Sequence, residues 1–324
     1  MHPLTRRACH LYRTNTCILR RSINSSSLAP SRFITPSGLR CHATVVSHTV
    51  PSLTLPCLEA PDLSHAESLD HVGRVSEQLE RSGMLKVSLG FEDDDSNYLK
   101  RLLVSLHRHR GHQLPISHSA TRGWFWDVRP SETNFQAKNH QARSETMNEF
   151  PWHTDCSYED PPPRFFALQV LQHDRCGGGT LSVMNVDKLS ELLSPEARSA
   201  LLAQEYRITI PPEFIKDPEQ KNIIGSVFVT NPNDQSTMIR FREDILTPLT
   251  DQASRALLEL KEALLKEEVQ AHSTVHLRSA DLPKGSIILM DNRRWLHARN
   301  NIKDPERHLR RVRWDACPFE TVSA

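Results

Sequence analysis

A histidine and an aspartate stand two positions apart in the segment FPWHTDCSYE, residues 150–159. Neutral imidazoles and carboxylates are ligands for divalent metal ions, and residues two apart in a strand point to the same face. His153 and Asp155 could therefore reach one ion. In a chain with 17 histidines such a pair is a weak signal by itself. The hypothesis of a metal site depends on a third ligand and a cosubstrate anchor further along.

His297 can supply the third ligand. It follows an apolar strand and a polar turn in GSIILMDNRRWLHARN, residues 285–300. Two imidazoles and one carboxylate on one side of Fe(II) leave positions open for a chelating cosubstrate and for O₂. Together with His153 and Asp155, this histidine completes a set of that kind.

A cosubstrate anchor follows the third histidine. 2-Oxoglutarate chelates iron through its keto acid end, and its far carboxylate needs a fixed cation, best a planar guanidinium. Arg307 and Arg311 lie ten and fourteen residues after His297, and their even spacing would place both on one face of a last core strand. Thr180, just past a run of three glycines, could add a hydroxyl to the same carboxylate. Alternatively, the two arginines could form ion pairs on an edge strand, and Thr180 could be present only because threonine favours strands.

Three segments resemble the TauD/TfdA superfamily of Fe(II)/2-oxoglutarate-dependent dioxygenases, which includes taurine dioxygenase and γ-butyrobetaine hydroxylase. WHTDCSYEDPPPRFFALQVLQHDRCGGGTLSVMNVDKL has that family's H-T-D, tyrosine, Pro-Pro pair, apolar strand and Gly-Gly turn. WLHARN…RHLRRVRWD resembles its H-G-R…R-H-L…D segment, and GWFWDV its G-x-x-W-D-V stretch. The resemblance covers roughly residues 115–317.

The resemblance implies a distorted double-stranded β-helix that binds Fe(II), 2-oxoglutarate and O₂. It implies hydroxylation, or desaturation, of a small molecule with release of succinate and CO₂, and no catalytic residue beyond the metal ligands. The carboxylate of Asp155 favours hydroxylation or desaturation over halogenation, because halogenation needs that ligand position free for chloride. The residues that match the family pattern are the iron ligands His153, Asp155 and His297 and the cosubstrate residues Thr180, Arg307 and Arg311, the last with a role toward cosubstrate or substrate.

The substrate is expected to be anionic or amino-acid-like, because an arginine would lie beside the iron. Arg122, Trp152 and Tyr158 are candidate substrate contacts. Packing could equally explain Trp152 and Tyr158, and Arg122 could only cap a strand. Two other functions stay open: a zinc hydrolase or isomerase that uses the same ligands, and a non-catalytic jelly-roll binding module. A zinc hydrolase would have no use for Arg307 and Thr180 as a binding site for a dicarboxylate. A non-catalytic module would not need the complete set of three metal ligands.

The elements that must position these residues are mostly strands. Short β-rich runs are predicted at 123–128, 164–171, 180–186, 206–210, 226–230, 285–291 and 309–316. Helices are predicted within 64–83, 94–111, 186–204 and 251–270. This order favours a mainly β, α+β architecture: a jelly roll with helical additions. A doubly wound sheet is less favoured, because Gly177–Gly179 lacks the phosphate-loop spacing and more plausibly turns the chain between two strands.

Residues 1–58 differ from the rest of the chain. They contain seven arginines and no acidic residue, which leaves 33 of the 40 basic residues against 39 acidic ones in the remainder. The basic character therefore belongs to this leader, and no nucleic-acid partner is expected. An arginine-rich, serine-rich and acid-free leader is typical of a mitochondrial transit peptide. We expect residues 1–58 to be a disordered transit peptide and linker, and 59–324 to be the dioxygenase domain.

Localisation follows from the leader: mitochondrial if it is a targeting signal, otherwise cytoplasmic. Import of a fusion that carries residues 1–50 would test this. Four of the seven cysteines lie in the leader and the other three show no CxxC spacing, so no disulfide framework is expected. No segment approaches the roughly 20 apolar residues of a membrane span. A homo-oligomer is compatible with the sequence.

Overall fold

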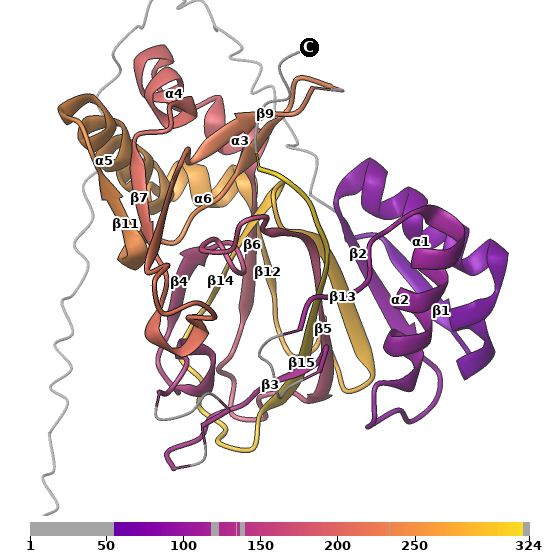
Figure 1. Cartoon of the computed structure of the whole chain (residues 1–324). Coiled ribbons are helices and arrows are strands. Elements are labelled where there is room, and N and C mark those ends of the chain that lie inside the picture. Colours follow the sequence, from indigo (N-terminus) through magenta and orange to yellow (C-terminus); the bar gives the residue numbers. More distant parts are fainter. Residues whose placement is uncertain (1–54, 118–122, 134, 137–139, 233, 320–324) are drawn as a thin grey trace, which may run out of the picture. The chain divides into compact units, whose positions relative to one another are not determined.

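The computed structural model describes residues 55–117, 123–133, 135–136, 140–232 and 234–319 (Figure 1). The predicted transit peptide and linker lie outside these residues except for their last four positions, and so does Arg122. The mitochondrial address stays a prediction. The elements from Cys57 to Ala316 belong to one compact unit. None of the helices in the described part of the chain has the length and apolar character that crossing a membrane requires.

The larger sheet has six strands in the order β1-β2-β13-β5-β15-β3. The predicted strands appear as β3 (Trp126–Val128), β5 (Pro163–Gln172), β13 (Ser286–Asp291) and β15 (His308–Ala316). Two strands of this sheet were not predicted: β2 (Met84–Leu89) and β1 (Cys57–Ala60), which begins two residues before the expected start of the domain. The ordered domain therefore includes the last two residues of the predicted linker.

A four-stranded antiparallel sheet, in the order β12-β6-β14-β4, forms the second layer of the barrel. Its strands are β4 (Phe150–His153), β6 (Leu181–Asn185), β12 (Thr274–Leu277) and β14 (Trp295–Arg299). Phe166 and Ile288 of the large sheet share one buried cluster with Val183 and Trp295 of the small one. The two sheets therefore enclose a common apolar interior, and the predicted jelly roll is confirmed.

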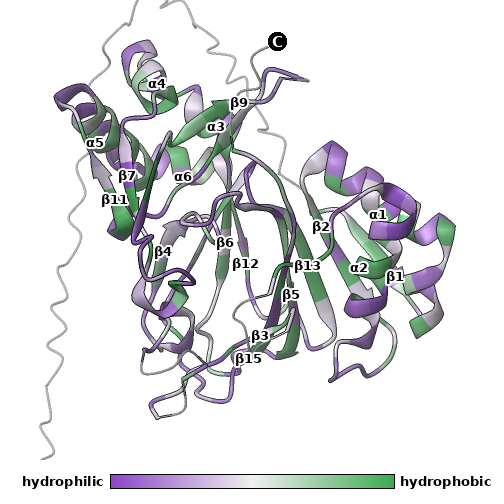
Figure 2. Cartoon of the chain, in the orientation of Figure 1, coloured by the Kyte–Doolittle hydropathy of each residue, from purple (hydrophilic) through white to green (hydrophobic). Residues whose placement is uncertain are grey.

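The large sheet is buried on both faces, which explains why its central strands are continuous apolar runs (Figure 2). In β13, Ile287 and Leu289 pack outward against helices, whereas Ile288 and Met290 face the barrel interior. The helices are α1 (Leu69–Ser82) and α2 (Asn97–Arg110). Each ends, as predicted, before a glycine with positive φ, Gly83 at 66° and Gly111 at 76°.

The outer side of the small sheet is covered by a helical layer inserted between β6 and β12. Its helices are α3 (Val186–Ser190), α4 (Pro195–Leu202), α5 (Asp251–Leu265) and α6 (Glu267–Ser273). The predicted helix restart at Ser194 is confirmed, because its side chain accepts a hydrogen bond from the Ala197 amide. Two small sheets accompany these helices: β7 (Tyr206–Thr209), β8 (Asn222–Gly225) and β11 (Leu246–Pro248), then β9 (Phe228–Thr230) and β10 (Thr237–Ile239).

The short strand β3 is joined to β15 by a charge cluster. Asp127 accepts hydrogen bonds from His308 Nε2 at 2.9 Å and from Arg310 Nε at 3.0 Å. The hydrogen bond from His308, followed by the Arg310 guanidinium, lowers the pKa of Asp127 to about 2, against the opposing effect of burial. The pKa of this carboxyl is lower in the folded protein than in the unfolded chain. It therefore stabilises the fold at pH values above its unfolded-state pKa, and this stabilisation is lost as the pH falls through its folded-state pKa.

We therefore expect Asp127→Asn to lower the free energy of unfolding by about 1–2 kcal/mol at pH 7. The difference from the unsubstituted protein should shrink as the pH falls from about 5 towards 2. Urea unfolding of both proteins across this range measures it. A loss that is the same at every pH would show that the ionised carboxylate is not what stabilises this contact.

Candidate functional site

The three predicted ligands come together at one end of the barrel. His153, Asp155 and His297 each offer a ligand atom, all of these within 4.8 Å of one another, and all three side chains are buried. His153 on β4 pairs directly with His297 on β14, and their ring centroids lie 4.1 Å apart. The ring of Phe166 on β5 lies against His297 at 4.6 Å. Antiparallel pairing of two strands far apart in sequence thus brings the imidazoles side by side.

One detail of the predicted geometry was wrong and another was missed. Strand β4 ends at His153, so Asp155 does not share a strand face with it. Asp155 lies instead in a turn, next to Cys156, whose φ is 53°. His297 follows an apolar strand and a turn, as expected, but it is itself the central residue of a strand, β14, that was not predicted. The cluster therefore combines His153 at the end of β4, Asp155 in the turn that follows, and His297 in β14.

Both imidazoles are neutral and therefore able to bind a metal. His153 Nδ1 donates to the Pro151 carbonyl at 2.7 Å, which leaves Nε2 with the free lone pair. Burial, followed by the proximity of His297, lowers the pKa of His153 well below its usual value. Burial also lowers the pKa of His297, to about 4. Near neutral pH neither ring carries a proton that a metal would have to displace.

Asp155 offers the negative charge of the cluster. Burial raises the pKa of this carboxyl, but the Arg311 guanidinium, with a smaller effect from His297, brings it below the ordinary value. Its Oδ1 accepts a hydrogen bond from Arg311 Nη1 at 2.9 Å, whereas Oδ2 is buried without a partner. A buried carboxylate oxygen without a partner, beside two neutral imidazoles, is a donor set that fits a divalent metal ion.

The structure gives Arg311 a more specific place than the sequence did. It was predicted to contact cosubstrate or substrate. On β15 it projects into the barrel and binds the ligand carboxylate itself, with its side chain 8% exposed. Arg311 therefore keeps Asp155 ionised and holds one of its two oxygens.

Arg307 lies just before β15. It lines a pocket together with aliphatic side chains, among them Leu168, Leu181 and Ile288, and with polar and charged ones, His173, Asp174, Arg278 and Ser279. Its Nη1 is buried without a partner. Burial, followed by the nearby Arg299, lowers the pKa of Arg307 to about 9, so the guanidinium is still charged at neutral pH. The nearby Asp174 carboxylate opposes this lowering, but among the described residues it forms no ion pair with Arg307, and the unpartnered Nη1 fits an anionic ligand in this pocket.

The run of glycines allows the close approach of Arg307. As predicted, Gly177–Gly179 turns the chain between β5 and β6. A side chain at Gly179 would place its Cβ 2.7 Å from Arg307 Nε, and φ there is +65°. Thr180 follows directly, half-buried, with its amide bound to Asn300 Oδ1 at 2.7 Å. The structure thus places Thr180 on the segment that backs the guanidinium.

A second pocket opens over the metal-ligand cluster. It is lined by aromatic and charged residues, among them Arg143, Phe150, Tyr158, Glu213, Phe214 and Arg242. Tyr158 is there as predicted, stacked on Phe214 at 5.0 Å, and burial raises the pKa of its phenol. Trp152 packs partly against the helical layer behind β4 and also lines an adjoining pocket with Phe150, His153 and Arg242, so its role toward a substrate stays a prediction.

The sequence did not reveal most of this pocket. The ring of Phe150 stacks on His153 with centroids 3.7 Å apart and an angle of 10° between the planes. The guanidinium carbons of Arg143 and Arg242 lie 5.4 and 5.7 Å from the centroid of the same ring. Phe150 could have been suspected from its place three residues before His153. Arg242 and Phe214 come from the inserted helical region and have no local signal.

Comparison with known proteins is consistent with this geometry. The family model described as "Taurine catabolism dioxygenase TauD, TfdA family" matches residues 61–313. The chain is 28% identical over 149 residues to the L-asparagine oxygenase of Streptomyces coelicolor (strain ATCC BAA-471 / A3(2) / M145). That alignment covers 46% of this chain and 41% of the relative, so less than half of the curated relative's length is spanned.

Solved structures show the same fold. A crystal structure of asparagine oxygenase with Fe(II), 2S,3S-3-hydroxyasparagine and succinate has a TM-score of 0.59 at 17% identity and covers 79% of this chain and 92% of that one. The non-heme iron oxygenase OrfP in complex with Fe and alpha-ketoglutaric acid has a TM-score of 0.55 at 16% identity and covers 79% and 84%.

Proposed function

The chain belongs to the TauD, TfdA family of dioxygenases, which use Fe(II), 2-oxoglutarate and O₂, and from this premise we propose that it hydroxylates a small amino-acid-like substrate with release of succinate and CO₂. His153, Asp155 and His297 would hold the iron. Arg307, with Thr180 beside it, would bind the far carboxylate of 2-oxoglutarate. One observation carries the proposal: Asp155 Oδ2 and Arg307 Nη1 are both buried without a partner, one suited to a cation and the other to an anion.

The chain's own residues contribute geometry, charge and exclusion of water. Iron supplies the redox chemistry when bound, coupling decarboxylation of 2-oxoglutarate to oxidation of a substrate C–H bond. His153 and His297 stay neutral, and Arg311 holds Asp155 ionised, so the ligands need no proton transfer before they bind. The aliphatic side chains in the pocket lining would limit the water that competes for the Arg307 guanidinium, which would strengthen its bond to a carboxylate.

The substrate class follows from the charges of the pocket over the ligands. Four arginines line it: Arg143, Arg242, Arg311 and Arg313. The carboxylates opposite them are Glu213 and Asp155, and Asp244, which pairs with Arg242 and Arg143. This balance favours a substrate with a carboxylate, and Glu213 offers a partner for an ammonium group. The asparagine and arginine derivatives named in the complexes of the similar structures are amino acids of this kind. The zinc enzyme and the non-catalytic module fit less well, because neither has a use for the guanidinium of Arg307.

Anaerobic titration of Fe(II) and then 2-oxoglutarate into the purified protein tests the proposal. We expect a weak visible charge-transfer band at roughly 500 nm, as for a keto acid chelated to iron on such a ligand set. Succinate release with a panel of amino acids would then identify the substrate. If no band forms, or if Zn(II) alone supports turnover without 2-oxoglutarate, the proposal is wrong.

A further inference from the structure

The ligand Asp155 has no strand to hold it. It lies in the turn beyond β4, so no sheet ladder fixes its backbone. The side chain of Asn292 takes over this role. Its Oδ1 accepts a hydrogen bond from the Asp155 amide at 2.7 Å, and its Nδ2 donates to the Asp155 carbonyl at 2.8 Å. One side-chain amide therefore binds both polar backbone groups of the residue that carries the carboxylate.

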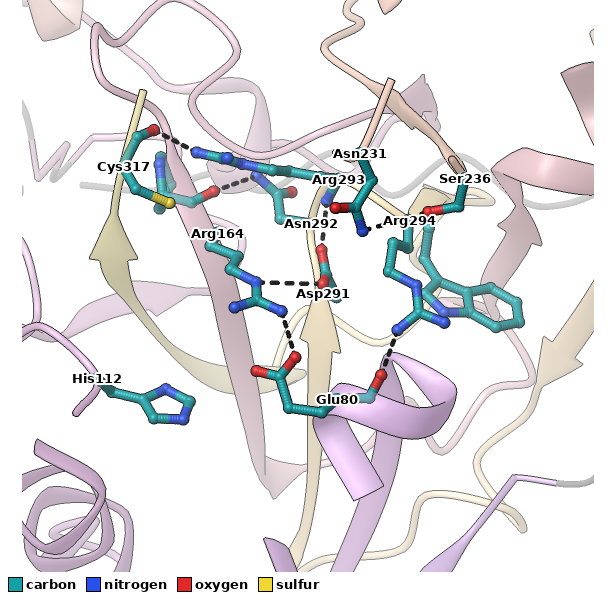
Figure 3. A network of polar contacts seen from close by, with 12 residues as sticks. Glu80, His112, Arg164, Asn231, Ser236, Asp291, Asn292, Arg293, Arg294 and Cys317 are labelled. Atoms are coloured by element: carbon teal, nitrogen blue, oxygen red, sulfur yellow. Dashed lines mark hydrogen bonds and ion pairs between the residues drawn. The ribbon is translucent and has the colours of Figure 1, made fainter. Parts of the chain in front are cut away.

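Asn292 is itself rigidly held. It is 2% exposed, in the tight connection between β13 and β14, and its Nδ2 also donates to the Pro163 carbonyl at 3.1 Å. Its backbone amide donates to the carbonyl of Arg164 at 2.7 Å. The preceding residue, Asp291, accepts from the Arg293 amide and lies 3.5 Å from Arg164 Nε (Figure 3). This network leaves the Asn292 amide little freedom to turn.

The two arginines that follow anchor the connection on either side. Arg293 donates to the carbonyls of Pro162 and Cys317, which fixes the far end of the loop after Asp155 and the chain beyond β15. Arg294 Nη1 donates to the Glu80 carbonyl on α1 at 2.8 Å (Figure 3). Strand β14 and His297 follow directly. The connection between β13 and β14 thus leads to His297 and, through Asn292, binds the turn that carries Asp155.

We propose that Asn292 is a positioning residue of the metal centre, which holds the Asp155 carboxylate against the imidazoles of His153 and His297. The inference rests on the proposed metal site. Without the Asn292 amide, two buried backbone groups of Asp155 lose their partners, and the turn can shift to find others. Arg311 binds only Asp155 Oδ1 and does not fix the backbone of the turn. A shift of the turn would therefore move Oδ2 away from the imidazoles. Outer residues that orient a ligand commonly change metal affinity by about 10- to 100-fold.

Arg294 provides the matched control. It belongs to the same connection, and its side-chain hydrogen bonds lead to α1 and not to a ligand. Asn292→Ala and Arg294→Ala should both lower the melting temperature. Only Asn292→Ala should raise the dissociation constant for Co(II), measured anaerobically by the visible spectrum of the folded protein, by at least about tenfold. Arg294→Ala should leave it within about twofold.

A double-mutant cycle with Asp155→Ala shows whether Asn292 acts through this ligand. Once the carboxylate is gone, adding Asn292→Ala should cost no further Co(II) affinity. If Asn292→Ala does not fold, Asn292→Ser is the second variant, since its shorter side chain cannot span both backbone groups. Unchanged Co(II) affinity in a folded Asn292 variant, or fully additive losses in the cycle, would overturn the inference. Failure of the unsubstituted protein to bind Co(II) would instead count against the metal site.

Discussion

We expect His153→Ala to lose Fe(II) binding and with it oxygenase turnover. The substitution removes one of the three ligand side chains and leaves an imidazole and a carboxylate, which hold Fe(II) weakly without a third protein ligand. Since loss of an outer-shell partner alone costs up to about 100-fold in affinity, loss of the ligand should cost more than that. The band formed by iron and 2-oxoglutarate should disappear, and succinate should fall below detection.

His276→Ala is a suitable control for this experiment. His276 lies exposed on β12 of the same sheet, where β6 separates it from β14, and it bonds to Ser182 Oγ at 2.8 Å. It should retain the Fe(II) affinity of the unsubstituted protein. Circular dichroism would confirm that both variants fold, because His153→Ala also removes the stacking partner of Phe150. Full Fe(II) affinity in folded His153→Ala would refute the assignment of this residue as a ligand.

Arg307→Met should separate cosubstrate binding from stability. Methionine is an unbranched side chain without charge, and aliphatic residues of the pocket lining, such as Leu168 and Leu309, can pack against it. Charge-assisted hydrogen bonds contribute about 1.5–3 kcal/mol, so the dissociation constant for 2-oxoglutarate should rise about 10- to 100-fold. Without ligand, the variant should be at least as stable as the unsubstituted protein, because it no longer buries a guanidinium nitrogen without a partner.

Thermal unfolding with and without 2-oxoglutarate, in the presence of metal, measures both effects. The unsubstituted protein should be stabilised by the cosubstrate and the variant should not be at the same concentration. Arg310→Ala serves as the control, since Arg310 binds Asp127 on β3 and not the pocket. It should lose stability but keep its 2-oxoglutarate affinity. If Arg307→Met kept that affinity, another cation would have to bind the far carboxylate.

The sequence alone was sufficient to propose the site residues whose types and local spacing suit a metal centre and an anion anchor. His153 and Asp155 are two positions apart in the sequence, and Arg307 and Arg311 follow His297 within fourteen residues. Helix ends were equally accessible, because a positive φ favours glycine at Gly83 and Gly111 wherever the helices pack. The central strands β5 and β13 were recognisable because burial on both faces requires a continuous apolar run.

Only the tertiary structure decided how these residues meet. Strand β14 is short and mixed in polarity, so it is a strand because β6 and β4 pair with it on either side. The turn at Asp155 is set by Asn292, which is 137 residues away in the chain. The pocket over the ligands depends on Arg242 and Phe214 from the inserted helical region. Contacts between distant segments arise from the packing of whole elements, and no local pattern of residues encodes them.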